Sequence, residues 1–318
     1  MERPILSARG AAGYLEALDN VLLLTHVRPD GDTIGSAAAL CRALRDFGQT
    51  AYLLPNPEIT ATYAPYAAPY WAPEGWQAEH IVSVDIADAS LLPENAQSYR
   101  DRIELAIDHH PSQTFFARNT CLEADSAACG EIVYEIIQHL TALTADIALP
   151  LYVAVSTDCG GFQYGNTTAR THRIAAALMD VVDVAAVNKA LFRTKSRVRL
   201  AMESRMVADM KLFDHQRVVV MEIPLSLRQE MQAPDADIEE LCALPALVEG
   251  TDCGVTLREL RPGTVKVSVR TGPRVDACAL CRILGGGGHH AASGATVEGT
   301  LDEARMAVLA AYRKVIGA

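Results

Sequence analysis

Short, almost uniformly apolar runs alternate with helix-patterned segments along the first two-thirds of this 318-residue chain. Such runs are typical of strands that are buried on both faces. Five strands are predicted, at residues 21–24, 51–54, 81–84, 104–107 and 151–155. Apolar residues on helical spacing over 33–47, and a similar segment over 130–140, predict helices. The alternation predicts an α/β fold with an N-terminal, mostly parallel sheet flanked by helices.

The last third of the chain follows a different pattern. Residues 187–214 are charged and helical, and we expect them to form one helix that connects two domains. Beyond it, strands are predicted at 218–221, 253–257 and 265–269, followed by four glycines at 285–288 and a final helix at 301–316. The predicted organisation is a first domain over 1–186, the connecting helix over 187–214 and a smaller α/β domain over 215–318.

Composition and charge exclude several classes of protein. The chain is 50% hydrophobic and 21% charged, an ordinary globular balance. No apolar run reaches the roughly 18 residues that span a bilayer, and the start does not have a secretory signal pattern, so we expect a cytoplasmic protein without membrane association. The net charge of -11 disfavours long duplex nucleic acid as a partner. Only Cys278 and Cys281 form a close pair, so reduced thiols are expected rather than a structural zinc site.

Ionisable side chains follow four of the predicted strands. Ligands of an open parallel sheet bind beyond the carboxyl ends of its strands, so these side chains are expected to converge on one crevice. A single aspartate in such a place is usually an N-cap or a surface residue, but four sets after four apolar runs favour a site. The residues are His26, Asp30 and Asp32 after the first strand, Asp85 after the third, Asp108, His109 and His110 after the fourth, and Asp158 after the fifth.

The charges in this crevice indicate what it binds. Asp30, Asp32, Asp85 and Asp158 would place four carboxylates in one crevice, where they repel one another unless cations are present. Two divalent ions would offset that charge, and oxygen ligands together with imidazole favour Mn²⁺, with Mg²⁺ as the alternative. Two such ions activate water and bind a phosphoryl group. The sequence therefore predicts a two-metal hydrolase of phosphoesters.

The four-glycine run predicts a second binding element. Successive backbone N–H groups of glycines can form an anion-binding concavity. The run is not a P-loop, because no Gly-Lys-Ser/Thr follows it. A flexible linker is the alternative, but this run continues directly into His289 and the sequence HAASG between patterned elements. We therefore expect the backbone of Gly286, Gly287 and Gly288 to bind a phosphate or a nucleotide terminus.

Together these motifs resemble the DHH phosphoesterase superfamily. The match consists of His26-x-x-x-Asp30-x-Asp32, then Asp85, Asp108-His109-His110 and Asp158. The sequence GGGGHHAASG at 285–294 is similar to the signature of the DHH-associated substrate domain. The compact two-domain layout resembles the nanoRNase and pAp phosphatase group. Cys159 stands where a threonine is usual after the last aspartate.

The resemblance implies a role for each residue. One ion would be held by His26, Asp30 and Asp85, and the other by Asp32, Asp85, His109 and Asp158. His110 would lie near the attacked phosphate as a catalytic residue, and Asp108 would orient the neighbouring histidines. The second domain would supply Arg270 and His289 as ligands of the substrate phosphate.

The function predicted on these grounds is a Mn²⁺-dependent phosphoesterase of short oligoribonucleotides and of pAp (3′-phosphoadenosine 5′-phosphate). Three alternatives stay open: a phosphodiesterase of linear dinucleotides such as pApA or pGpG, a pyrophosphatase-like enzyme, and a silent nucleotide-binding module. The glycine–histidine segment disfavours the pyrophosphatase, and the complete set of metal ligands disfavours the silent module. A homodimer is compatible with the resemblance.

Overall fold

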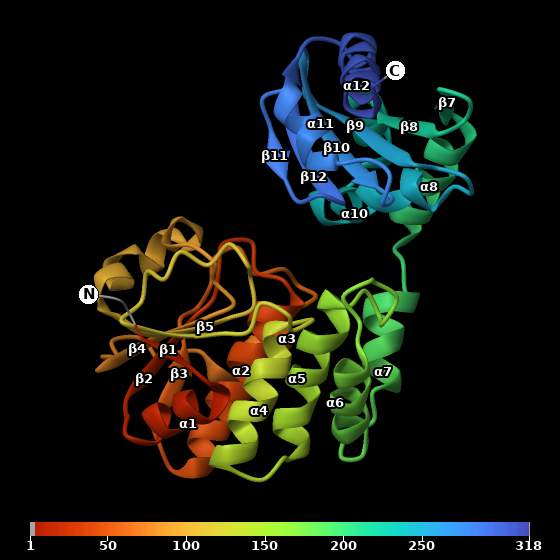
Figure 1. The fold of residues 1–318 in the computed structure, drawn as a ribbon. Helices are drawn as coiled ribbons and strands as arrows, with labels where there is room; N and C mark the ends of the chain where they lie inside the picture. Colours follow the sequence, from red (N-terminus) through yellow and green to blue (C-terminus); the bar gives the residue numbers. More distant parts are fainter. Residues whose placement is uncertain (1–3, 318) are drawn as a thin grey trace. The chain divides into compact units, whose positions relative to one another are not determined.

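The chain forms two compact units, residues 1–194 and 195–318. The structure is a computed structural model, and it describes residues 4–317 apart from the side chains of Ala236 and Glu240. The predicted domain ranges begin at residue 1 and end at residue 318, and these outermost residues lie outside the described part. Each unit contains one sheet, and each is described by itself below (Figure 1).

The first unit is built on a six-stranded parallel sheet, which confirms the predicted fold class. The strand order is β1-β6-β5-β4-β2-β3, and every neighbouring pair is parallel. All four residues of β2 are buried, as expected for an apolar strand in the middle of a sheet. The strands are β1 (Ile5–Leu6), β2 (Val21–Leu24), β3 (Ala51–Leu53), β4 (His80–Val84), β5 (Ile103–Asp108) and β6 (Asn119–Leu122).

Long helices cover one face of this sheet. They pack on the alternate strand residues that include Leu23, Val82 and Leu105. The other alternate set, with Leu22, Ile81 and Ile103, lies under short 3-10 helices and the loop around Trp76. The long helices are α1 (Ala8–Glu16), α2 (Gly31–Phe47), α4 (Cys129–Leu140), α5 (Ala145–Asp158) and α6 (Ala169–Met179), and the short α3 (Ala64–Ala67) and η1 (Ala68–Tyr70) pack on the same side. The 3-10 helices on the other face are η2 (Ala89–Leu91) and η3 (Glu94–Arg102).

One predicted strand is wrong, because residues 151–155 lie inside α5. This helix packs against α2, α4 and α6, and all residues from Leu151 to Ser156 are buried. A helix enclosed on all sides has no polar face, so its apolar run cannot be distinguished from a buried strand by periodicity. The short strands β1 and β6, which were not predicted, complete the sheet instead.

The predicted single connecting helix is also wrong. Helix α7 (Ala185–Asn188) continues as a π-helical turn (Lys189–Arg193), and a separate helix α8 (Arg197–Ala208) begins after a break. The backbone of Thr194 is extended, and the Ser196 side chain caps α8 by accepting a hydrogen bond from the backbone N–H of Arg199 at 2.9 Å. Strand β7 (Lys211–Phe213) then occupies the end of the predicted helical range.

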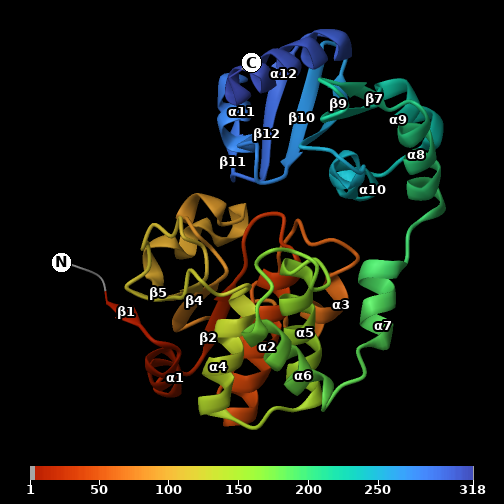
Figure 2. The same ribbon diagram turned by 45° about the vertical axis from the view of Figure 1, so that its right-hand side comes forward.

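The second unit contains a six-stranded mixed sheet in the order β11-β12-β10-β9-β8-β7, in which only β8 and β9 are parallel. Its further strands are β8 (Val218–Ile223), β9 (Cys253–Arg261), β10 (Thr264–Thr271), β11 (Gly287–Gly288) and β12 (Ala292–Glu298). Helices α11 (Ala277–Ile283) and α12 (Leu301–Ile316) pack on one face (Figure 2). Helices α8, α9 (Leu225–Met231) and α10 (Asp235–Glu240) and the 3-10 helix η5 (Leu241–Leu247) pack on the other. The predicted second α/β domain is thereby confirmed as a second sheet unit.

The contact between α2 and α5 gives a testable prediction. A Cβ on Gly35 would come within 2.2 Å of the Pro150 carbonyl oxygen, so Gly35→Ala should lower the free energy of unfolding by about 1–3 kcal/mol. Gly13→Ala in α1 is the matched control, since a methyl group there meets nothing within 4 Å; it should raise stability by up to about 1 kcal/mol. Urea denaturation measures both, and equal effects would contradict the close approach of α2 and α5.

Candidate metal centre

The first ligand group lies at the junction of β2 and α2. Asp30 is the N-cap of α2, and its Oδ1 accepts hydrogen bonds from the backbone N–H groups of Asp32 and Thr33 at 3.0 and 3.1 Å. His26, four residues earlier, has its Nε2 atom 3.6 Å from the same oxygen. The cap role expected of a lone aspartate is therefore present, and it fixes Asp30 beside an imidazole.

Asp85 lies at the centre of the cluster. Its Oδ2 is 3.8 Å from His26 Nε2, and its Oδ1 is 3.6 Å from His109 Nε2. Asp85 directly follows β4 and has a positive φ of 61°, a left-handed conformation that costs a non-glycine residue of order 1–3 kcal/mol. Its N–H donates to the Ile107 carbonyl at 2.8 Å, which ties this bend to β5.

The remaining ligands surround His109. Its Nε2 lies 3.8 Å from Asp32 Oδ2 and 3.7 Å from Asp158 Oδ2. Asp158 is the last residue of α5, so this candidate ligand comes from a helix end and not from the predicted strand end. The six residues proposed as metal ligands from the sequence thus lie together in the first unit. Among the described residues, three groups could hold a metal ion: His26, Asp30 and Asp85; Asp32, His109 and Asp158; and Asp85, His109 and His110.

The distances in this cluster fit divalent cations. Separations of 3.6–3.8 Å are too long for hydrogen bonds. Two atoms that each lie about 2.1 Å from one ion are at most about 4.2 Å apart, so every one of these pairs could share an ion. Asp85 Oδ1 is also buried without a hydrogen-bond partner, which is costly unless a cation satisfies it. The donor set could therefore bind divalent metal.

The electrostatics of the cluster support the same conclusion. Burial raises the pKa of Asp32 and Asp85 well above the ordinary value, and repulsion from the neighbouring carboxylates raises it further. Burial also raises the pKa of Asp158. Burial alone would lower the pKa of His26, but the adjacent Asp30 carboxylate reverses the shift and the net change is upward. Metal binding at this site would therefore compete with protonation of the buried carboxyl groups.

Hydrogen bonds orient the imidazoles so that one nitrogen of each remains free. His109 Nδ1 donates to the Ser126 carbonyl at 3.0 Å, and His26 Nδ1 donates to the Val27 carbonyl at 2.8 Å. In the neutral form of each ring Nε2 is then the unprotonated nitrogen, as a metal ligand requires. His110 differs, because its Nδ1 donates to Asp108 Oδ1 at 2.7 Å. This hydrogen bond raises the pKa of His110.

The sequence did not identify several residues that hold these groups in place. Gln113 Nε2 donates to Asp108 Oδ2 at 2.7 Å, and Asn56 Nδ2 donates to the His26 carbonyl at 2.8 Å. Asp32 accepts from the Ser36 hydroxyl at 2.9 Å and from the first two N–H groups of α4 at 2.6 and 3.0 Å. Gln113 and Ser36 lie within four positions of a candidate site residue, whereas nothing in the sequence around Asn56 indicates its role.

The predicted substrate residues of the second unit lie at one end of its sheet. Arg270 pairs with Ala292 in the register of β10 and β12. His289 exchanges backbone hydrogen bonds with Ala292 at 2.8 and 3.2 Å, which closes the β11–β12 hairpin. A Cβ on Gly286 would come within 2.1 Å of the Gly294 carbonyl, so this position requires glycine. The glycine run is thus part of a hairpin beside Arg270 and not a linker.

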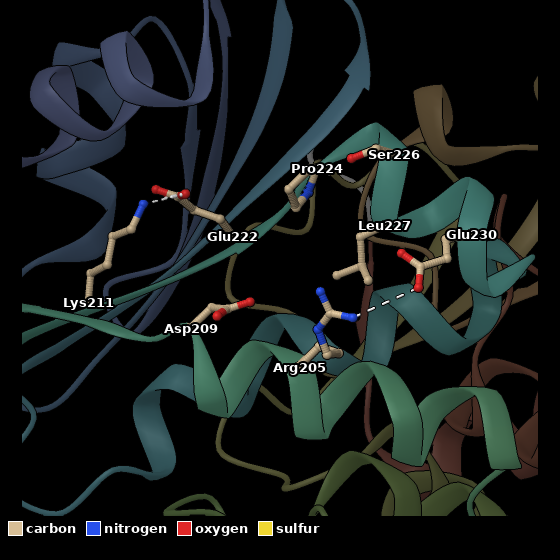
Figure 3. Close-up of a pocket in the computed structure, with 8 residues that line it drawn as sticks. All are labelled: Arg205, Asp209, Lys211, Glu222, Pro224, Ser226, Leu227 and Glu230. Atoms are coloured by element: carbon tan, nitrogen blue, oxygen red, sulfur yellow. Dashed lines mark hydrogen bonds and ion pairs between the residues drawn. The ribbon is translucent and has the colours of Figure 1, made fainter.

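A cavity elsewhere in the second unit does not suit an anionic ligand. It has a volume of about 390 Å³ and lies between α8, β8 and α9 (Figure 3). Its two basic side chains already face carboxylates: Lys211 is 2.7 Å from Glu222 and Arg205 is 3.8 Å from Glu230. With Asp209 the lining carries more acid than base, which disfavours an anionic ligand.

Comparison with known proteins agrees with this geometry. A family model described as "DHH family, N-terminal domain" matches residues 20–155. The chain is 32% identical over 313 residues to the bifunctional oligoribonuclease and PAP phosphatase NrnA of Thermus thermophilus, across 96% of this chain and 93% of that protein. The chain belongs to the DHH family.

Two further proteins are similar to this chain over most of its length. It is 24% identical over 288 residues to the protein of the same name from Bacillus subtilis, across 88% of this chain and 90% of that one. The fold resembles the crystal structure of an exopolyphosphatase-related protein from Bacteroides fragilis, with a TM-score of 0.88, 21% identity and coverage of 98% and 96%. Among the described residues, no helix has the length and apolar character needed to cross a membrane.

The buried charge gives a prediction about pH. Because Asp32 and Asp85 have raised pKa values in the native state, that state binds more protons than the unfolded chain above pH of about 4. The free energy of unfolding of the metal-free protein should therefore fall as pH rises toward neutrality. Asp85→Asn removes one buried charge, so it should raise the metal-free Tm at pH 8 by about 2–4 °C, or about 1 kcal/mol. The gain should shrink at pH 5.

Calorimetry with and without MnCl₂ completes this test. The native protein should gain stability from Mn²⁺, whereas Asp85→Asn should lose most of that gain because the shared ligand is missing. A variant that is less stable at pH 8, or that is stabilised by Mn²⁺ as strongly as the native protein, would contradict the central role of Asp85.

Proposed function

We propose that this chain is a phosphoester hydrolase that cleaves short oligoribonucleotides and removes phosphate from pAp. The observation that carries the proposal is Asp85, a buried carboxylate with an unpaired oxygen that belongs to two ligand groups at once. Two cations sharing one carboxylate are suited to phosphoryl chemistry. The similarity to relatives named as oligoribonuclease and PAP phosphatase supports the substrate class. We further propose that the enzyme acts in the cytoplasm.

In this proposal, one cation is held by His26, Asp30 and Asp85, and the other by Asp32, Asp85, His109 and Asp158. When bound, such cations lower the pKa of coordinated water and offset charge on phosphate oxygens, and Mn²⁺ is preferred because the ligands mix oxygen and imidazole.

His110 would act as the general acid of the reaction. Its hydrogen bond to Asp108 raises its pKa, so the imidazolium persists to higher pH. A protonated His110 would donate a proton to the leaving oxygen as the phosphorus–oxygen bond breaks. Asp108, which is fully buried and also accepts from Gln113, would hold the imidazole in position and stabilise its positive charge.

The second unit would bind the phosphate or nucleotide end that is not attacked. Arg270 can present a guanidinium fork to a phosphate, and the backbone of Gly286, Gly287, Gly288 and His289 can supply N–H donors. The net charge of -11 disfavours long polyanions, so short substrates fit this chain better than long RNA. Linear dinucleotides such as pApA and pGpG fall within the same class.

A parallel assay tests the function. The full chain with MnCl₂ is offered pAp, pApA, a five-nucleotide RNA and pyrophosphate, and the products are separated by chromatography. We expect phosphate from pAp and mononucleotides from the two oligonucleotides, with pyrophosphate left intact. His110→Ala should lower kcat by about 10²–10⁴-fold while bound Mn²⁺ is retained. No turnover of any compound would favour a silent module, and turnover of pyrophosphate alone would favour a pyrophosphatase.

The role of the second unit has its own test. Arg270→Ala should raise KM for pAp by about 10- to 100-fold with a smaller effect on kcat, because a charge-assisted hydrogen bond is worth about 1.5–3 kcal/mol. Arg274→Ala is the matched control: its side chain is 69% exposed, and it should change KM little. An unchanged KM in Arg270→Ala would remove this residue from the substrate site.

A further inference from the structure

The loop of residues 123–128, between β6 and α4, controls two of the ligands in the metal centre. Its Ser126 carbonyl accepts the Nδ1–H of His109 at 3.0 Å. Directly after the loop, the N–H groups of Cys129 and Gly130 donate to the Asp32 carboxylate at 2.6 and 3.0 Å. A shift of this loop would therefore rotate His109 and release Asp32 together.

Arg170 from α6 holds this loop. Its Nη1 donates to Glu123 Oε2 at 2.8 Å and to Ser126 Oγ at 3.0 Å. The Ser126 hydroxyl in turn donates to Glu123 Oε2 at 3.0 Å. The three side chains form a closed triangle, in which the single donor of the hydroxyl and one of its acceptor positions are both used.

The other side of the Arg170 guanidinium faces α4. Its Nη2 is 2.6 Å from Glu135 and its Nε is 3.7 Å from Glu131, which is only 1% exposed. Glu131 also accepts from the Thr171 hydroxyl at 2.5 Å. One guanidinium thus joins α6 to both α4 and the loop, a geometry that the planar fork of arginine permits and a lysine ammonium does not.

A second contact holds the same loop from the segment that follows α5. Asn166 Nδ2 donates to the Ala127 carbonyl at 2.9 Å and to the Asp158 carbonyl at 3.1 Å. The loop is therefore connected to three ligands of the same proposed ion, Asp32, His109 and Asp158. In the described part of the chain, His26 and Asp30 have no hydrogen bond or ion pair with this loop or with Arg170.

We propose that Arg170 is a positioning residue for one of the two cations. By fixing the loop, it keeps the Ser126 carbonyl on His109 Nδ1, which leaves Nε2 as the ligand atom beside Asp32 and Asp158. The inference rests on the proposed function only in assuming that cations occupy the centre. A guanidinium that merely stabilised the fold would affect both cation sites equally, whereas a positioning residue affects the site of Asp32, His109 and Asp158.

Calorimetric titration of the metal-free full chain with MnCl₂ tests this selectivity. In Arg170→Gln, one of the two Mn²⁺ ions should bind about 10- to 100-fold more weakly, the usual cost of removing a group that orients a ligand, while the other keeps its affinity. Nitrogen-detected NMR of the metal-free protein should show His109 losing its single Nδ1–H tautomer. Arg173→Gln is the matched control, since Arg173 is exposed on the same helix, and it should leave both affinities and the tautomer unchanged.

Ser126→Ala is the second variant, because Arg170→Gln leaves the buried Glu131 with one partner fewer and could fail to fold. Loss of the hydroxyl removes two contacts among Arg170, Glu123 and Ser126, while the backbone carbonyl of residue 126 remains. The same Mn²⁺ ion should therefore bind more weakly than in the native chain, but the loss of affinity should be smaller than in Arg170→Gln. Native-like affinity for both ions and an unchanged His109 tautomer in a folded Arg170→Gln, or in Ser126→Ala if the first does not fold, overturns the proposal.

The outcomes separate this inference from the proposed function. A native chain that binds two Mn²⁺ ions but hydrolyses none of the nucleotides would overturn the proposed function alone, and the variants would still decide the role of Arg170. A native chain that binds no divalent cation would overturn the metal centre and the role of Arg170 together.

Discussion

Repulsion among buried carboxylates is the constraint on which the first unit depends. Asp32 and Asp85 are almost completely buried, and Asp30 and Asp158 lie beside the same imidazoles. Asp30, Asp32 and Asp85 come together because β4 and β2 are adjacent and parallel, so the residues that follow these strands share one edge of the sheet. Asp158 reaches the same place from the end of α5. The clustered negative charge destabilises the fold, and the same charge is what attracts divalent cations. Bound cations would offset both the repulsion between the carboxylates and the cost of burying them.

The surrounding framework resists that repulsion with backbone hydrogen bonds and packed apolar side chains. Helix α4 directs its first N–H groups at Asp32, which places the positive end of a helix dipole on a buried anion. Helix α2 packs so closely on α5 that Gly35 has no room for a side chain. The residues that meet the cations can therefore hold their places before any cation arrives, as a preorganised site requires.

The sequence predicted which side chains lie together better than it predicted the elements that carry them. His26, Asp30, Asp32, Asp85 and His109 follow apolar strands, and the rule that ligands gather beyond strand ends applies to parallel sheets in general. Asp158 was assigned to a strand end because a helix enclosed by neighbours is apolar on every side. The break between α7 and α8 is marked by a single capping serine, Ser196. One serine in a charged segment with helical spacing is not enough to predict that a helix ends there. Arg170 and Ser126 could not be predicted at all, since their roles depend on contacts between residues 44 positions apart.

The left-handed backbone conformation of Asp85 restricts which residue types can occupy this position. This restriction is independent of whether the site needs a negative charge there. Glycine adopts that conformation freely but offers no ligand oxygen, and glutamate carries the charge but belongs to the residue types that rarely tolerate it. Aspartate and asparagine are the residues that combine a short oxygen-bearing side chain with tolerance of a positive φ. Backbone conformation thus favours two amino acids at this position, and the need for a negative charge favours aspartate over asparagine.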